Sequence, residues 1–445
     1  MAKNMTEGKP LKLILAFMFP VLCGNLFQNF YNIVDSMIVG RFLGVDALAA
    51  VGSTTSLNFL VVGWITGMTS GFGILISQAY GAKDEKRLKH YVAMSTYLCI
   101  ALAVVMTVGL LLANGWILTT MNTPEKIYAD TWEYIAIIYA GLPATILYNM
   151  LAAIARSLGD SKTPLYFLVT SAFLNIFGDL FFVVVLRWGV AGSAIATVCS
   201  EGLCCLLCGI YIKKKIPLLC LGKKWWVFDK SLLGKTVSYG STSAMQQVCL
   251  QLGKLIIQSV VNTQGAAVMA AFTAVNRVDD FAYTPQQNIG HAMTTFLAQN
   301  KGAGHKERMK KGFQTGLLIE LVYSIGLFCV IWGLAPQIMT LFAEDGDAQV
   351  VSLGISYLHL ISWMYILPGL TNGVQGFFRG IGDLKVTLYS TFMNMFGRVV
   401  AVFVMIRLLQ MEFASLAWAN MVGWIVMLLF EVPLLVKSMR NGECG

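Results

Sequence analysis

Long apolar runs recur along the whole chain, and they limit its fold more than any other feature. Val92–Ala113 contains no charged residue, and Glu320 alone interrupts the run Leu317–Leu334. Such runs match the roughly 20 apolar residues that an α-helix needs to cross a bilayer. Charged residues make up 12% of the chain, about half their usual share in a soluble domain. We therefore expect an all-α integral membrane protein without a large soluble domain.

The apolar pattern divides the chain into twelve transmembrane spans joined by short loops. The spans are expected at about residues 13–40, 47–80, 91–113, 130–155, 163–186, 189–212, 236–261, 266–300, 312–342, 350–378, 386–406 and 413–436. Loops on one side of the membrane carry 25 of the 32 Lys and Arg residues, and loops on the other side carry four. Because positive loops face the cytoplasm, we expect both termini there. This distribution accounts for the net charge of +9, and we therefore expect no nucleic-acid partner.

The two halves of the chain repeat one pattern. The corner Gln78–Ala82 matches Gln299–Ala303, and the turn Arg156–Lys162 matches Arg379–Lys385. Each half holds six spans, and an even number returns the chain to the same side of the membrane. The repeat is therefore parallel, with its axis along the membrane normal.

This repeat predicts two pseudo-symmetric six-helix bundles. The expected lobes are residues 1–218, with spans 1–6, and residues 219–445, with spans 7–12, joined by the basic cytoplasmic loop 213–235. Two such bundles suit alternating access, in which the halves rock around a central substrate site. The alternative is a duplication that is kept only for stability.

Four polar residues of the first half are expected at one depth in the membrane. Asp35 in span 1, Asp179 in span 5 and Thr197 in span 6 each lie about 9–14 Å below the outer surface, and Asn175 precedes Asp179 by one turn. Two carboxylates, an amide and a hydroxyl supply hard oxygen ligands for a small cation, and two adjacent carboxylates also form a proton site. We predict a coupling site for Na⁺ or H⁺, with Asp35, Asn175 and Asp179 as candidate Na⁺ ligands. The simpler alternative is that each group only hydrogen-bonds a neighbouring helix.

Further residues are candidates for the substrate cavity and for a gating kink. Gln28 and Asn32 share the helical face of Asp35. Asn149 and Asn372 occupy matching positions of the repeat, and all four amides are predicted to line the cavity. Pro20 lies early in span 1, where a missing backbone N–H predicts a kink. That kink would let the outer part of the span bend when the charge of Asp35 changes.

The second half carries a mixed set of charges inside its spans. Lys254 lies in span 7, Arg277, Asp279 and Asp280 lie in span 8, and Arg398 lies in span 11. A charge in hydrocarbon costs roughly 2.5–3.5 kcal/mol on insertion scales, so we expect Lys254 and Arg398 to point into the lobe and to meet Asp279 or Asp280. A structural network of ion pairs is the favoured interpretation. An open cationic cavity would instead suit an anionic substrate.

Several features of the chain together resemble the multidrug and toxin extrusion (MATE) family. They are the sequence from Asp35 to Gly44, the Gln-x-x-Gly-Ala corners, the Arg-x-x-Gly-Asp turns and the six-plus-six repeat. The resemblance covers essentially the whole chain. It implies a V-shaped, two-lobed antiporter that exports organic, often cationic compounds against the entry of Na⁺ or H⁺. Within the family, the first-lobe proline kink and cation site of the prokaryotic DinF-type branch match Pro20, Asp35, Asn175, Asp179 and Thr197. In the second lobe, cationic residues stand where another branch keeps acidic ones.

These observations predict a secondary antiporter of the cell membrane that works as a monomer and needs no cofactor beyond the coupling ion. Its expected partners are the lipid bilayer and small-molecule substrates. The nearest rival is a lipid-linked saccharide flippase of the same superfamily, whose pyrophosphate substrate Lys254, Arg277 and Arg398 would suit. An enzyme is not expected, because the sequence lacks Gly-x-Ser-x-Gly, His-Glu-x-x-His and a nucleotide-binding glycine-rich loop.

Overall fold

A computed structural model describes residues 4–219, 222–342, 348–407 and 413–440, and within these ranges the chain is helical without strands. Residues 220 and 221 of the predicted basic loop lie outside the described residues. The first half contributes α1 (Pro10–Leu43), α2 (Val45–Gly81), α3 (Glu85–Thr120), α4 (Glu125–Ser157), α5 (Lys162–Asp179), η1 (Leu180–Val185), α6 (Gly189–Lys215), η2 (Pro217–Leu219) and η3 (Lys223–Trp225). The second half contributes α7 (Lys230–Val261), α8 (Ala266–Gly302), α9 (Lys306–Phe342), α10 (Ala348–Ser362), η5 (Trp363–Tyr365), α11 (Ile366–Ile381), α12 (Leu384–Arg407) and α13 (Ala414–Arg440).

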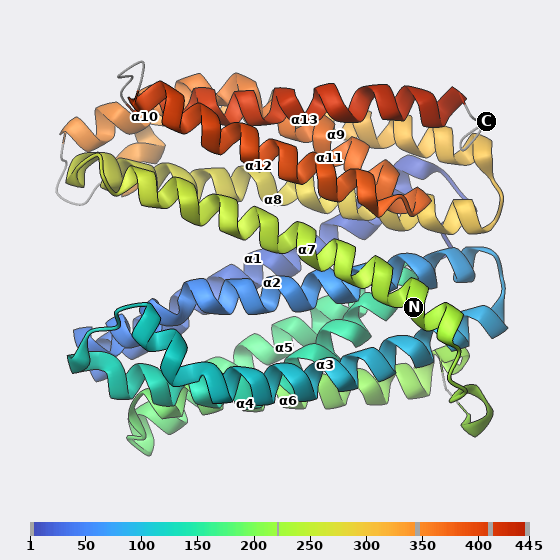
Figure 1. Cartoon of the computed structure of the whole chain (residues 1–445), viewed down its shortest axis with the longest axis horizontal. Coiled ribbons are helices and arrows are strands. Elements are labelled where there is room, and N and C mark those ends of the chain that lie inside the picture. Colours follow the sequence, from blue (N-terminus) through green and yellow to red (C-terminus); the bar gives the residue numbers. More distant parts are fainter. Residues whose placement is uncertain (1–3, 220–221, 343–347, 408–412, 441–445) are drawn as a thin grey trace. The chain divides into compact units, whose positions relative to one another are not determined.

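These elements form twelve spans, which confirms the predicted fold class. Ten of the spans in the described ranges are long and apolar enough to cross a membrane by length and composition alone. The other two are α7 and α8, which are long enough but more polar, with Lys254 on α7 and Asp279 on α8. The helices of each half run side by side, with the loops at their ends (Figure 1).

The chain forms two compact units, which divide inside two helices. Unit 1 comprises residues Met1–Asn4 and Phe19–Ala244, and unit 2 comprises Met5–Met18 and Met245–Gly445. Each of α1 and α7 therefore contributes to both units. The lobe boundary predicted at residue 218 stays a prediction.

Two spans differ from the unbroken helices that the sequence predicts. Span 5 continues from α5 into the π-helical segment η1 directly after Asp179. Span 10 divides into α10 and α11 at the 3₁₀ turn η5. Pro368 explains the second break, because it has no backbone N–H and its ring clashes with the carbonyl group four residues earlier.

The repeated motifs fold in the same way in both halves. At the end of α2 the N–H of Ala82 donates to the carbonyl of Gln78, and at the end of α8 Ala303 donates to Gln299, both at 3.0 Å. The two Arg-x-x-Gly-Asp turns also agree, since Gly159 and Gly382 have φ of 80° and 83°. This left-handed conformation is open to glycine at little steric cost, which explains the glycine in both turns.

The core of unit 1 forms where α2, α3, α4 and α6 pack together. Gly67 and Gly71 on α2 allow a close approach of the first part of α7. A Cβ atom at Gly71 would lie 2.4 Å from the carbonyl oxygen of Tyr239, and one at Gly67 would lie 2.5 Å from the Cα of Ala244. Small residues four apart bring helix backbones together in this way in membrane proteins.

Unit 2 holds its own core and also binds the N-terminal segment. The core is built mainly from α8, α9, α10, α11 and α13. The N–H of Met5 donates to Gln299 Oε1 at 2.9 Å, and its carbonyl accepts from Asn300 and from Arg308, each at 3.1 Å. The repeated corner at the end of α8 therefore also anchors the start of the chain.

Candidate cation and substrate site

A pair of carboxyl groups forms the centre of the candidate site. Asp35 comes from α1 and Asp179 ends α5, and their carboxyl groups lie within hydrogen-bonding reach of each other. Asp179 has no exposed surface, and neither of its carboxyl oxygens meets a hydrogen-bond donor in the described part of the chain. A buried charge without a partner is strongly disfavoured, and two negative charges this close to each other repel. The arrangement therefore favours uptake of a cation or a proton.

Neutral oxygen groups from α5 and α6 surround this pair. Ser193 Oγ donates to Asp35 Oδ1 at 2.8 Å, and Asn175 Nδ2 donates to Thr197 Oγ1 at 3.1 Å. Asn175 is buried, and its Oδ1 meets no donor among the described residues. The structure thus brings together the four residues predicted for the coupling site, and it adds Ser193.

The backbone changes its helical geometry directly after Asp179. In η1 the N–H of Leu186 donates to the carbonyl of Phe181, five residues earlier, at 2.9 Å. π-Helical segments of this kind occur frequently at functional sites. Gly192 lets α6 pack against the segment, because a Cβ atom there would lie 3.1 Å from the backbone of Phe182. This close packing positions the neighbouring Ser193 for its hydrogen bond to Asp35.

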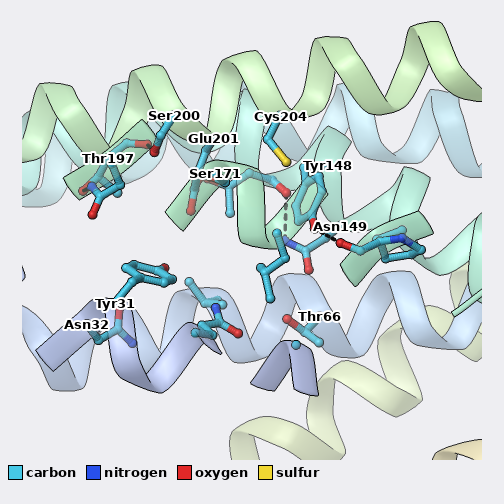
Figure 2. Close-up of a pocket in the computed structure, with 18 of the residues that line it drawn as sticks. Tyr31, Asn32, Thr66, Tyr148, Asn149, Ser171, Thr197, Ser200, Glu201 and Cys204 are labelled. Carbon is cyan, nitrogen blue, oxygen red and sulfur yellow. Dashed lines mark hydrogen bonds between the residues drawn. The ribbon is translucent and has the colours of Figure 1, made fainter. Parts of the chain in front are cut away.

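A polar cavity of about 350 Å³ lies beside the acidic pair, and all the residues that line it belong to unit 1. Its volume is at the lower end of the range for small-molecule sites, roughly 300–1,000 Å³. Figure 2 shows Tyr31 and Asn32 of α1 across the cavity from Thr197 and Glu201 of α6. The lining includes Asp35, Asn175 and Thr197 together with the predicted Pro20, Gln28, Asn32 and Asn149.

The fourth amide predicted for the cavity, Asn372, lies elsewhere. It belongs to α11 in unit 2, where its side chain donates to the carbonyl of Pro368 at 2.8 Å. Asn149 makes the matching bond in unit 1, donating to the carbonyl of Thr145 at 2.9 Å. The repeat therefore preserves the local hydrogen bond of both amides, but the structure does not bring Asn372 to this cavity.

Glu201 adds a carboxylate to the cavity wall, one helical turn after Thr197. The hydroxyl group of Thr145 on α4 donates a hydrogen bond to it. Ser193, Thr197 and Glu201 recur every four residues, which places all three on one face of α6. This spacing is the sequence signal for Ser193 and Glu201, although the sequence-based site prediction includes only Thr197.

The charged residues of unit 2 form local contacts of two kinds. Lys254 Nζ lies 3.3 Å from Asp280 Oδ1, so the expected partner is present. Both side chains are more than half exposed, at 59% and 64%, so the predicted interior position of Lys254 is wrong. Asp280 is itself at the unit surface, and Lys254 can therefore meet its carboxylate there without burial of either charge. Arg277 is also exposed.

Asp279 instead lies in the interior of unit 2. Tyr357 Oη donates to it at 3.3 Å, the hydroxyl of Tyr365 also donates to it, and Arg398 lies close enough to interact electrostatically. Asn420 Nδ2 in turn donates to Tyr357 Oη at 3.0 Å. Asp279 thus belongs to a buried hydrogen-bonded network, separate from the surface pair of Lys254 and Asp280.

A model of the MatE family matches residues 20–181 and 243–406, which is most of the chain. The chain belongs to the MatE family. The probable multidrug resistance protein YoeA of Bacillus subtilis is 32% identical over 389 residues, covering 85% of this chain and 82% of that protein. The probable multidrug resistance protein NorM of Thermotoga maritima is 22% identical over 423 residues, covering 93% of this chain and 89% of that protein.

Solved MATE structures share the fold of the chain. One is described as an outward-facing multidrug resistance MATE family transporter of the MOP superfamily, and it superposes with a TM-score of 0.91 at 22% identity, covering 100% of this chain and 98% of that one. A MOP superfamily transporter from Pyrococcus furiosus gives a TM-score of 0.90 at 23% identity, with 98% of each chain covered. As a MatE member the chain is a multi-pass membrane transporter of small molecules rather than an enzyme. The flippase alternative is not favoured.

Proposed function

We propose that the chain exports organic, often cationic and amphipathic, compounds in exchange for Na⁺ or H⁺. The observation that carries this proposal is the carboxyl pair beside a polar cavity, in which Asp179 is buried and Asp35 is half-buried. Relatives named as multidrug resistance proteins support the class of substrate. The coupling ion binds at Asp35, Asn175, Asp179 and Thr197, and the organic substrate binds in the adjoining cavity.

Coupling follows from the repulsion within the carboxyl pair. Without a bound ion, two negative charges disfavour one packing of α1 against α5. A bound Na⁺ or proton removes that repulsion, and an ion that binds two conformations with different affinity shifts the equilibrium between them. The outer part of α1 bends near Pro20, which lines the same cavity. Entry of the ion therefore reshapes the substrate site and lowers its affinity for the exported compound.

Glu201 gives the cavity its preference for cations. Its carboxylate is half-buried and its hydrogen bond comes from a neutral hydroxyl group, that of Thr145. An ionised carboxylate at this position attracts an organic cation in the cavity. Aromatic rings of Tyr31 and Tyr148 line the same cavity, and aromatic faces attract organic cations. The amides Gln28, Asn32 and Asn149 supply hydrogen bonds that adapt to different substrates.

The membrane arrangement completes the proposal. The transporter lies in the cell membrane with both termini in the cytoplasm, since the basic loops lie on the side of the termini. It works as a monomer of two lobes, residues 1–218 and 219–445, and requires no cofactor other than the coupling ion.

Efflux from proteoliposomes with independent Na⁺ and pH gradients tests this function. We expect an inward gradient of one of the two ions to drive export of a fluorescent organic cation, and its collapse by an ionophore to stop export. Transport that continues at the same rate without either gradient would contradict the antiport mechanism.

A further inference from the structure

An apolar groove on the surface of unit 1 takes no part in the site described above. It consists of two cavities, of about 350 Å³ and 390 Å³, that follow one another along α3. Val92 and Thr96 line the first cavity, and Ile100, Val104 and Val108 line the second. These residues recur every four positions, so one face of α3 runs along the whole groove. The three residues of the second cavity are each at least half exposed, which opens the groove to the surrounding lipid.

The helix α4 forms the facing wall of this groove, because α3 and α4 pack along each other. Ile154 and Leu151 line the first cavity, and Leu147 and Pro143 line the second. The lining residues of α3 extend over about 24 Å at a rise of 1.5 Å per residue. That length is close to the roughly 20 Å of one bilayer leaflet with its headgroups, so the groove matches the length of a lipid molecule.

Positive charge gathers at one end of the groove. Lys213, at the end of α6, is the only charged residue among the described residues that line either cavity. Two more lysines follow it, at positions 214 and 215, and all three are exposed. Lys89 Nζ and Lys224 Nζ each lie 5.1 Å from the centre of the Trp225 ring, which attracts both cations. Lysine clusters beside a transmembrane helix attract the headgroups of anionic lipids.

Aromatic residues hold the segment after α6 at the same end of the groove. Trp226, directly after Trp225, lines the first cavity together with Lys213. Tyr97 Oη donates to the carbonyl of Trp226 at 3.2 Å, and the two rings pack edge to face with their centroids 5.4 Å apart. Because Trp and Tyr gather where a membrane meets water, this end of the groove lies at the level of the lipid headgroups.

Acidic residues near this end neutralise few of the lysines. Glu85 pairs with Lys89, one turn further along α3. Asp229 accepts hydrogen bonds from the backbone N–H groups of residues 231 and 232 at the start of α7, at 2.9 Å and 3.0 Å. Lys214, Lys215 and Lys224 form no ion pair within the described part of the chain. The charge at this end therefore suits an anion.

We propose that unit 1 binds an anionic phospholipid of the leaflet on the side of the chain termini. Its phosphate group contacts Lys213 and Lys224, and one of its acyl chains lies in the groove between α3 and α4. A free phosphate compound would use the lysines without the groove, and a neutral lipid would use the groove without the lysines. The presence of both along one path favours the anionic lipid over either alternative.

Native mass spectrometry of the delipidated full-length protein in detergent tests this proposal, with phosphatidylglycerol and phosphatidylcholine of equal chain length as the probes. We expect phosphatidylglycerol to bind several-fold more tightly. Lys213→Gln/Lys224→Gln should weaken its binding about fivefold for each lysine removed and leave phosphatidylcholine unaffected. Lys310→Gln/Lys311→Gln is the matched control, because it removes two exposed lysines near the start of α9 in unit 2, and it should leave both affinities unchanged.

Gly209→Leu tests the groove without changing the charge. A Cβ atom at Gly209, which lines the first cavity, would meet Leu151 at an ordinary 3.8 Å, so the rest of the leucine side chain occupies the groove. We expect this variant to weaken phosphatidylglycerol binding several-fold. Gly326→Leu on α9, where no atom lies within 4 Å of a Cβ, should leave that binding unchanged.

Two results would overturn the proposal. One is an equal affinity of the wild-type protein for phosphatidylglycerol and phosphatidylcholine, which would show that the lysines select no headgroup. The other is binding of phosphatidylglycerol that falls in the lysine variant but not in Gly209→Leu, which would indicate an anion site that needs no acyl chain.

Discussion

Replacement of Glu201 by glutamine should weaken the binding of organic cations and spare neutral compounds of similar shape. Glutamine keeps the volume and can still accept the hydrogen bond from Thr145, so the change removes the charge alone. Two unit charges 4 Å apart attract by about 1 kcal/mol in water and about 4 kcal/mol at an effective dielectric constant of 20. Glu201 is half-buried, and desolvation offsets part of the attraction. We expect a net loss of about 1–3 kcal/mol, or roughly 5- to 150-fold in Kd.

Isothermal titration calorimetry of the purified protein in detergent measures this effect. Tetraphenylphosphonium is the cationic ligand, and triphenylphosphine oxide is a neutral ligand of related shape. Glu125→Gln is the control variant, because Glu125 is an exposed acid at the start of α4 in the same unit. The reasoning would be refuted by an unchanged Kd for the cation, or by an equal loss of affinity for both ligands.

Three further changes test the packing, the coupling site and a helix cap. Gly71→Ala should lower the Tm, because the new Cβ would meet the backbone of Tyr239 at 2.4 Å and overpacking costs about 1–3 kcal/mol. Gly52→Ala on the same helix should leave the Tm unchanged, because no atom lies within 4 Å of the position of its Cβ. Thr197→Val removes the hydroxyl group that accepts a hydrogen bond from Asn175 at 3.1 Å. A hydrogen bond of this kind contributes about 1 kcal/mol, so the ion concentration for half-maximal efflux should rise about fivefold. Thr170→Val, at an exposed position, should leave that concentration unchanged. Burial acts to raise the pKa of Asp160, but the pKa lies below its usual value, and the hydrogen bonds that Asp160 accepts from Thr163 at the start of α5 contribute to lowering it. A carboxyl group whose pKa is lower in the folded than in the unfolded state stabilises the fold at pH values above the unfolded-state pKa. Asp160→Ala should therefore cost about 1 kcal/mol of stability at neutral pH, and its difference in Tm from wild type should shrink as the pH falls below about 4. A difference in Tm that grew on acidification would contradict this account.

The fold could be predicted from the sequence because a bilayer leaves a chain few choices. Backbone groups in hydrocarbon must bond within a helix, so an apolar run such as Val92–Ala113 specifies a span almost by itself. The repeat was equally clear, since the two Arg-x-x-Gly-Asp turns fold with the same left-handed glycine. The helix break at η5 was harder to predict, because prolines also occur in continuous transmembrane helices.

The candidate site was predictable where helical periodicity and depth agreed. Asp35, Asp179 and Thr197 could be placed at one depth from their distance to the span ends. In the structure Asp35 and Thr197 line one cavity, and Asp179 lies beside Asp35. The exposed position of Lys254 could not be predicted in this way, because depth along a helix does not specify which face of the helix points outward.

The central claim is that the carboxyl pair couples ion entry to export, and the variant Asp35→Asn tests it most directly. Asparagine keeps the size of the side chain and can accept the hydrogen bond from Ser193, so the protein should fold and still bind organic cations. We measure gradient-driven efflux of a fluorescent cation from proteoliposomes, with Asp179→Asn as a parallel variant. The account predicts that both variants lose gradient-driven efflux while wild type retains it. Efflux at the wild-type rate by purified Asp35→Asn would contradict the account.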